Sequence, residues 1–212
     1  MAGHYPVFLD VTGRRCAVIG GGPVAERKVA GLIEAGARVS VIAPALTGRL
    51  AEWARQQAIR HVAREYRRGD LAGHRLVFIA ADREAVTEAV TREARERGIW
   101  VNAADDPARC DFILPGVVRR GLLTVAVSSG GSSPALTRAI REELEGYFTK
   151  DYTLLARVTA AAREELRRRG ETATAEAWQR ALGGDLRRLV AVGREREAKA
   201  RLLEQLRSEA CR

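Results

Sequence analysis

Short apolar runs alternate with longer amphipathic stretches over the N-terminal half of the chain, and this alternation constrains the fold more than any other feature. The runs that predict strands are 15–19, 38–42, 61–66, 76–80 and 100–102. Helical spacing covers the intervening stretches 24–35, 46–57 and 83–97. The strongest runs are apolar at successive positions, as in parallel strands covered by helices on both faces. The sequence therefore predicts an α/β domain with a doubly wound, Rossmann-like parallel sheet.

The pattern changes after this domain. Runs 112–118 and 122–127 flank residues 119–121, which predicts a β-hairpin, and helical spacing follows over 134–145 with Gly146 as the stop. After residue 151 only helical spacing remains, interrupted by glycines. We therefore expect a Rossmann domain at 1–112, a hairpin-plus-helix region at 113–150 and a helical domain at 151–212.

Charge and composition narrow the class of partner. The formal net charge is +9, only three of the 36 basic residues are lysine, and aromatic residues make up 5% of the chain. The basic excess divides almost evenly between residues 1–150 and 151–212, so no dense basic stripe with interleaved aromatics is present for nucleic acid. We expect no nucleic-acid partner, and a diffuse positive field suits a small polyanionic ligand.

The sequence also bears on location and on metals. No run approaches the roughly 20 apolar residues of a membrane span, and the first residues lack a signal-peptide pattern. The cysteines Cys16, Cys110 and Cys211 are odd in number and show no CxxC spacing, while the three histidines lack metal-ligand spacing. We therefore expect a cytoplasmic protein with no membrane partner, no disulfide framework and no resident metal.

A glycine-rich turn follows the first predicted strand and opens the first helix. Gly20, Gly22 and Ala25 fit the pattern G-x-G-x-x-A, with Gly21 between the two glycines. In a dinucleotide site the first glycine makes the tight turn, the second lets the pyrophosphate approach, and the third position allows close packing of helix on strand. The N–H groups of the first helical turn then face the negative charge. This context favours a dinucleotide site over a purely structural turn.

The end of the second predicted strand tests the choice of dinucleotide. Residues 40–44 read Ser-Val-Ile-Ala-Pro, with no acidic residue for the ribose hydroxyls of NAD. No arginine stands there for the 2′-phosphate of NADP, since Arg49 comes later. The residues alone leave NAD and NADP both open.

An acidic segment lies just beyond the last strand of the predicted sheet. The carboxyl ends of parallel strands form the ligand crevice, so Asp105 and Asp106 are expected near a bound cofactor. Such a carboxylate can act as a general base. The alternative is a solvated Asp-Asp-Pro turn, and residue types alone leave both open.

A serine- and glycine-rich turn follows the predicted hairpin. Ser133 and Pro134 fit the N-cap and first position of the next helix, so the segment could serve simply as a capped helix start. Its hydroxyls and exposed N–H groups also suit a carboxylate or phosphate. The candidate substrate-binding residues are Ser128, Ser129, Gly130, Gly131, Ser132 and Arg138.

Several blocks together resemble one family. They are 5–10, 18–28, 32–37, 101–107, 111–115 and 125–135. Across residues 5–148 they resemble, in order, the precorrin-2 dehydrogenases, which are the N-terminal modules of siroheme synthases and in some members also sirohydrochlorin ferrochelatases. The resemblance implies oxidation of precorrin-2 to sirohydrochlorin with NAD⁺ as hydride acceptor, and in some members insertion of Fe²⁺. It also implies a homodimer with its active site between the Rossmann domain and the middle region.

The resemblance also assigns residues. It aligns Asp105 with the catalytic aspartate and Ser129 with a tetrapyrrole-facing serine that is phosphorylated in some members. The cofactor contacts that it implies, taken with the glycine turn, are Gly20, Gly21, Gly22, Pro23, Val24, Pro44 and Ala45. The chain lacks room for the methyltransferase domain fused in some relatives, so we expect another protein to supply precorrin-2.

Three questions stay open at this level. Dehydrogenase-only members share the same blocks, so ferrochelatase activity is undecided. Residues 151–212 are expected to support packing and the dimer, with direct substrate contact as the alternative. A regulatory Rossmann module that binds NAD(H) without catalysis would explain the glycine turn but not the blocks around Asp105 and Ser129.

Overall fold

The chain forms two compact units, Met1–Leu114 and Pro115–Arg212. A computed structural model describes residues 3–104 and 106–210, without the side chains of residues 209 and 210. The further predicted division of the second unit at residue 150 stays a prediction.

The first unit is built on a parallel sheet. Its strands are β1 (Arg15–Ile19), β2 (Arg38–Ile42), β3 (Ile59–Val62), β4 (Leu76–Ile79) and β5 (Trp100–Ala103). They lie in the order β3-β2-β1-β4-β5, so the direction of winding reverses between β1 and β4. Ligands of open α/β sheets bind at the carboxyl ends of the strands at this reversal. The predicted doubly wound, Rossmann-like sheet is confirmed.

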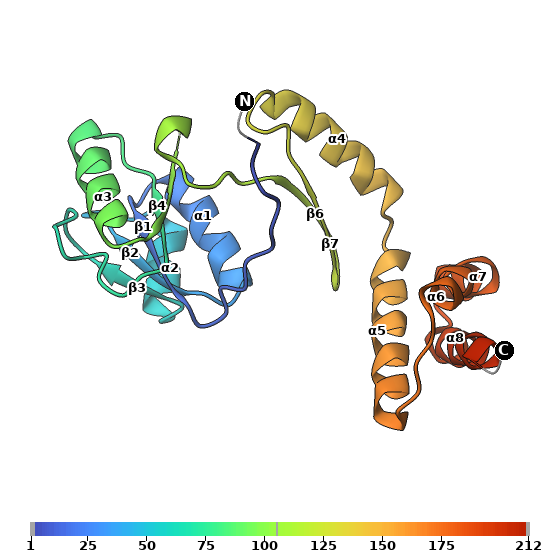
Figure 1. Cartoon of the computed structure of the whole chain (residues 1–212). Helices are drawn as coiled ribbons and strands as arrows, with labels where there is room; N and C mark the ends of the chain where they lie inside the picture. Colours follow the sequence, from blue (N-terminus) through green and yellow to red (C-terminus); the bar gives the residue numbers. More distant parts are fainter. Residues whose placement is uncertain (1–2, 105, 211–212) are drawn as a thin grey trace. The chain divides into compact units, whose positions relative to one another are not determined.

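Helices cover both faces of this sheet. They are α1 (Pro23–Glu34), α2 (Gly48–Arg55) and α3 (Glu84–Glu96). Alternate residues of β1 face opposite sides, because Cys16 and Val18 belong to the core under α1 and α2, whereas Ala17 and Ile19 belong to the core under α3. Figure 1 shows α1 and α3 on opposite faces of the sheet. Burial on both faces explains why these strands are apolar at successive positions.

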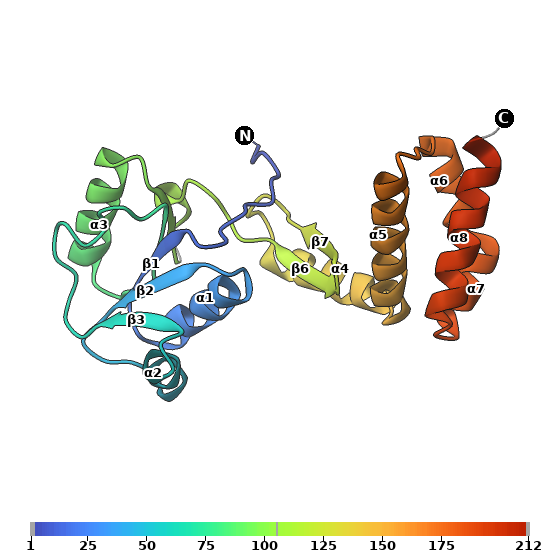
Figure 2. The ribbon, with the colours of Figure 1, turned by 90° about the horizontal axis from the view of Figure 1, so that it is seen from below.

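The second unit combines a hairpin with helices. Its elements are β6 (Gly116–Arg120), β7 (Leu123–Val127), α4 (Pro134–Tyr147), α5 (Asp151–Arg169), α6 (Ala175–Ala181), α7 (Gly184–Ala191) and α8 (Glu195–Ala210). The hairpin is antiparallel, and α4 packs on both of its strands. The four later helices share one apolar core, with α5 beside α8 (Figure 2). The predicted hairpin-plus-helix and helical parts are both present.

The hairpin differs from the prediction at its start and at its turn. The expected strand 112–118 begins only at Gly116, because Pro115 has no N–H for a ladder and Phe112 packs its ring on Phe78 of the first unit. The arginines at 119 and 120 are paired within the ladder, so the turn lies at residues 121–122, where Gly121 has φ +60°.

Two other boundaries differ. The strand predicted at 61–66 lies at Ile59–Val62. The helix expected to stop at Gly146 continues to Tyr147. Arg120 explains the longer helix, because its guanidinium donates to the carbonyl oxygens of Glu145 and Phe148 and so satisfies acceptors at the helix end. Tertiary contacts outweigh the helix-breaking preference of this glycine.

Candidate functional site

The glycine turn after β1 is shaped by close backbone approaches. Gly20 has φ +124°, and a Cβ there would lie 2.2 Å from the carbonyl oxygen of Ala80 at the end of β4. A Cβ at Gly21 would lie 1.9 Å from the carbonyl oxygen of Ala45. No other residue fits either position without moving backbone, so these two glycines are required by the fold itself.

Gly22 differs from its two neighbours. It is the N-cap of α1 in an extended conformation, it gives no side-chain cap, and a Cβ there would meet none of the described residues within 4 Å. Pro23 follows at the first helical position and has no N–H. The turn therefore leaves open space at the start of a helix whose first N–H groups have no capping side chain, which fits the pyrophosphate of a dinucleotide.

The segment after β2 is held against this turn. The backbone N–H of Thr47 donates to Gly21 O (2.9 Å), and the Thr47 hydroxyl donates to Glu26 Oε2 (2.6 Å). His61 Nε2 donates to Ala43 O (2.9 Å) at the end of β2. The structure thus brings the predicted cofactor residues at 20–24 together with Pro44 and Ala45, which are both exposed.

The acidic segment leaves β5 at the same edge of the sheet, with β4 between it and β1. Two hydrogen bonds join the residues on either side of this segment. Val101 N donates to Asp111 Oδ2 (2.8 Å), and Asp111 N donates to Val101 O (2.9 Å). Asp106 Oδ2 lies 3.3 Å from Arg109 Nε. Asp105, the predicted catalytic residue, lies outside the described residues.

A polar cluster beside this segment was missed by the sequence reasoning. Lys28 Nζ of α1 donates to Asn102 Oδ1 (3.3 Å) and lies 5.8 Å from the ring centre of Phe78. Asn102 Nδ2 donates to Phe112 O (3.0 Å), although Asn102 is only 6% exposed. The sequence feature that could have indicated this cluster is the polar side chain of Asn102, which lies in the last buried strand next to the acidic pair.

The thiol of Cys110 belongs to the same cluster. Its Sγ accepts from Ala103 N (3.2 Å) and lies 3.3 Å from the carbonyl oxygens of Ala103 and Asp106. Burial raises the pKa of Cys110, so the group stays a neutral thiol at neutral pH. It therefore ties the end of β5 to the start of the short 3₁₀ helix Pro107–Arg109.

The serine–glycine turn of the second unit is held by hydroxyl groups. Ser129 Oγ accepts from Ser133 N (3.0 Å), donates to Ser133 O (3.0 Å) and lies 3.1 Å from Thr137 Oγ1. Ser133 Oγ caps α4 by accepting from Leu136 N (3.2 Å). The Ser129 hydroxyl therefore makes its contacts within the turn and shapes it.

The rest of this turn is open to solvent. Gly130 and Gly131 have φ +64° and +85°, and a Cβ at either would meet nothing within 4 Å. Ser128 and Ser132 are exposed as well. The side chain of Arg138 is 78% exposed and pairs with Glu142 of the same helix (2.9 Å). An exposed pair of this kind is worth about 0–1 kcal/mol, so a ligand carboxylate could replace Glu142 at little cost.

The described residues contain neither a membrane-spanning helix nor a cluster of metal-ligating side chains. No helix among them combines the length and the apolar character of a membrane span. No group of three or more His, Cys, Asp or Glu side chains in these parts of the chain is arranged to hold a metal ion.

Two known protein families match parts of this chain. Residues 7–116, which hold the sheet and the glycine turn, match the family described as "Putative NAD(P)-binding". The chain belongs to this family. Residues 120–147 match a second family, described as "Sirohaem biosynthesis protein central". These matches confirm the predicted resemblance to siroheme synthase N-terminal modules, and they support a nicotinamide cofactor without separating NAD from NADP.

Individual relatives agree with the family models. The chain is 40% identical over 201 residues to a siroheme synthase of Nitrosococcus oceani and 38% identical over 207 residues to one of Photobacterium profundum. These matches cover 94% and 97% of this chain but only 43% and 44% of those proteins, so the chain spans less than half of their length. A solved structure named "SirC, precorrin-2 dehydrogenase" matches with a TM-score of 0.75 and 26% identity, over 97% of this chain and 100% of that one.

Proposed function

We propose that this chain oxidises precorrin-2 to sirohydrochlorin with NAD⁺. The observation that carries the proposal is the match to the precorrin-2 dehydrogenase SirC, which extends over nearly the whole of both chains. The siroheme synthases matched at about 40% identity support the same pathway. The reaction removes a hydride and a proton from precorrin-2 and gives sirohydrochlorin, NADH and a proton.

The cofactor would be held at the glycine turn. We assign its binding to Gly20, Gly21, Gly22, Pro23, Val24, Pro44 and Ala45. Their geometry supports this, because a side chain at Gly22 would enter open space where the first N–H groups of α1 lie. When bound, NAD⁺ supplies the hydride acceptor. The end of β2 lacks the carboxylate that would exclude a 2′-phosphate, so NADP is the comparison that the assay must include.

We assign the removal of the proton from precorrin-2 to Asp105. The family resemblance aligns Asp105 with the catalytic aspartate, so we assign to it the role of the base that takes the proton from the tetrapyrrole. The neighbouring carboxylate of Asp106 lies 3.3 Å from Arg109 Nε. Lys28, Asn102 and Cys110 would support the segment that carries it. Precorrin-2 is a polycarboxylate, and we assign its carboxylates to Arg138 and the exposed turn Ser128, Ser129, Gly130, Gly131 and Ser132.

We further propose a homodimer in the cytoplasm. The family resemblance supports the dimer, and the free thiols of Cys16 and Cys110 suit a reducing compartment. If the chain also acts as a ferrochelatase, Fe²⁺ is a second substrate. The nitrogens of the sirohydrochlorin macrocycle would then supply its ligands.

The direct test is turnover of precorrin-2 by the purified chain, followed by the visible spectrum of sirohydrochlorin and the absorbance of reduced nicotinamide. NAD⁺ is expected to support turnover, with NADP⁺ in a parallel arm and Fe²⁺ in a third that reports siroheme. Cofactor binding without any turnover would overturn the proposal in favour of a regulatory NAD(H)-binding module.

Asp105→Asn tests the assigned base, with Asp106→Asn as the matched control. We expect Asp105→Asn to keep NAD⁺ affinity and lower kcat at least about 100-fold, the usual scale for loss of a general base. Asp106→Asn loses one half-buried ion pair and should change kcat less than about fivefold. If the two variants behave alike, the base is not Asp105.

A further inference from the structure

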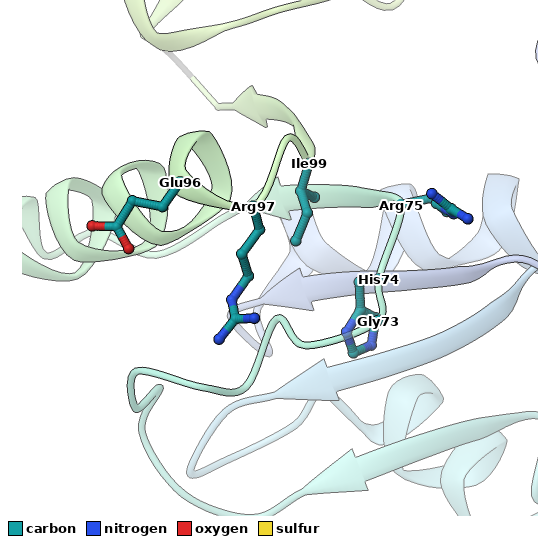
Figure 3. Close-up of a pocket in the computed structure, with 6 residues that line it drawn as sticks. All are labelled: Gly73, His74, Arg75, Glu96, Arg97 and Ile99. Atoms are coloured by element: carbon teal, nitrogen blue, oxygen red, sulfur yellow. The ribbon is translucent and has the colours of Figure 1, made fainter.

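The two ends of the parallel strands differ in what they offer a ligand. At the amino ends, Arg75 precedes β4 and Ile99 precedes β5, and both line a cavity of about 510 Å³. Figure 3 shows the side chains of Arg75 and Arg97 extending in different directions, so they do not converge on one ligand. At the carboxyl ends, the glycine turn follows β1, and the segment after β2 packs against it. The side chains that could select a dinucleotide therefore lie at the carboxyl ends.

Glu26 brings a carboxylate to the region after β2 from a different element. It lies in the first turn of α1, where the helix N-terminus favours a negative charge, and it is half-buried. Its Oε2 accepts a hydrogen bond from the hydroxyl of Thr47 (2.6 Å), which is the N-cap of α2. The segment 43–47 that follows β2 has no acidic residue of its own. An acidic side chain from α1 thus stands beside a segment that lacks one.

Thr47 fixes the position of this carboxylate. The backbone N–H of Thr47 donates to Gly21 O (2.9 Å), and its Oγ1 accepts from Leu50 N (3.3 Å). A hydroxyl has one proton, which Thr47 donates to Glu26, so the carboxylate is tied to both the glycine turn and the start of α2. An ionised carboxylate has about four acceptor sites, and Thr47 uses one of them. Glu26 can therefore accept hydrogen bonds from a ligand while Thr47 holds it.

Glu26 and Lys28 face opposite halves of the candidate nucleotide site. Two positions along a helix turn the side-chain direction by about 200°. Lys28 contacts Asn102 of β5 and Phe78 of β4, whereas Glu26 contacts Thr47 after β2. In a doubly wound sheet the adenosine ribose lies at the end of the second strand, and the rest of the dinucleotide crosses the point where the strand order reverses. Glu26 therefore lies on the adenosine side of α1.

We propose that Glu26 takes the place of the acidic residue missing from the end of β2 and selects NAD⁺ against NADP⁺. This inference rests on the nucleotide site proposed above. An ionised carboxylate accepts hydrogen bonds from ribose hydroxyls and repels a 2′-phosphate, so it favours one cofactor and disfavours the other. Arg49 is the competing group, because it lies in the first turn of α2. Its guanidinium stacks on the ring of Trp53 (4.8 Å), which lies further along that helix.

Glu26→Gln tests this role, because the glutamine carbonyl can still accept from the Thr47 hydroxyl while the charge is lost. The affinities of the whole chain for NAD⁺ and NADP⁺ are measured by calorimetry, without a tetrapyrrole. We expect the unsubstituted chain to bind NAD⁺ at least about tenfold more tightly than NADP⁺, and Glu26→Gln to reduce this ratio about tenfold, the scale of one charged hydrogen bond. Added salt should reduce the ratio in the unsubstituted chain but not in the variant, because ions screen the repulsion of the 2′-phosphate.

Glu52→Gln is the matched control. Glu52 is an exposed carboxylate on α2 that accepts from Gln56 (3.0 Å), so its loss should leave the ratio within about twofold. A ratio that survives Glu26→Gln overturns the inference, as does a preference of the unsubstituted chain for NADP⁺, which would assign the 2′-phosphate to Arg49. In either case both dinucleotides still bind, so the proposed dehydrogenase activity stands. A chain that binds neither dinucleotide overturns the proposed cofactor site and this inference with it.

Discussion

The two glycine-containing turns, one in each unit, are built on different principles. In the turn at residues 20–22, backbone from β4 and from the segment after β2 approaches so closely that Gly20 and Gly21 have no room for a Cβ. In the turn at residues 128–133, Gly130 and Gly131 have free space around them, and glycine is favoured there only by the positive φ angles.

The difference lies in what holds each turn. Backbone that follows β2 and β4 packs directly against the first turn and fixes its shape. The second is held by the hydroxyls of Ser129 and Ser133 and is otherwise exposed. A turn held by packed backbone suits a pyrophosphate, whose shape is constant. An exposed turn held by side-chain hydroxyl groups suits a substrate whose carboxylates vary in position. Substitutions should therefore have different costs in the two turns.

The largest difference in stability between the two turns is expected when a glycine in each is replaced by alanine. Gly20→Ala combines an unfavourable φ with a Cβ 2.2 Å from Ala80 O, so it should lower the free energy of unfolding by about 3–5 kcal/mol. Gly130→Ala meets only the unfavourable φ and should cost about 1–2 kcal/mol. Urea unfolding of both variants measures the two costs. Equal costs would mean that close backbone approach does not distinguish the turns.

Gly22→Leu separates binding from folding within the first turn. The position is extended and its Cβ meets none of the described residues, so the fold should tolerate leucine, but the side chain would occupy the space assigned to the pyrophosphate. We expect NAD⁺ affinity to fall at least about 100-fold, or about 2.7 kcal/mol, by calorimetry. Gly31→Leu adds the same side chain to open space further along α1 and should leave affinity unchanged. Retained binding in Gly22→Leu would remove the cofactor from this turn.

The fold was predictable because its signals are local. Strands buried on both faces must be apolar throughout, and this pattern located β1, β2, β4 and β5 to within a residue at each end. The glycine turn was recognisable for the same reason, since its residues lie between a strand and a helix that are both evident in the sequence.

The features that escaped prediction depend on contacts between distant residues. Gly146 stays helical because Arg120 reaches the helix end, and Phe112 leaves the hairpin for the ring of Phe78. The Lys28–Asn102 contact spans 74 positions. Sequence periodicity carries no information about such pairs, because it reports which face a residue occupies and not its partner.

Ser129→Ala should have the smallest effect of the three, and it tests what holds the second turn. The half-buried Ser129 hydroxyl bridges Ser133 N and Ser133 O, and a hydrogen bond of this kind is worth about 1 kcal/mol. Hydrogen exchange of the amides at residues 133–137 should therefore speed up about fivefold, while the sheet of the first unit keeps its protection. Ser128→Ala is the matched control, because Ser128 is exposed and water can replace its bond to Gly130 N. If Ser128→Ala loosens the turn as much as Ser129→Ala does, the turn is held by its backbone, and the contrast with the turn at residues 20–22 disappears.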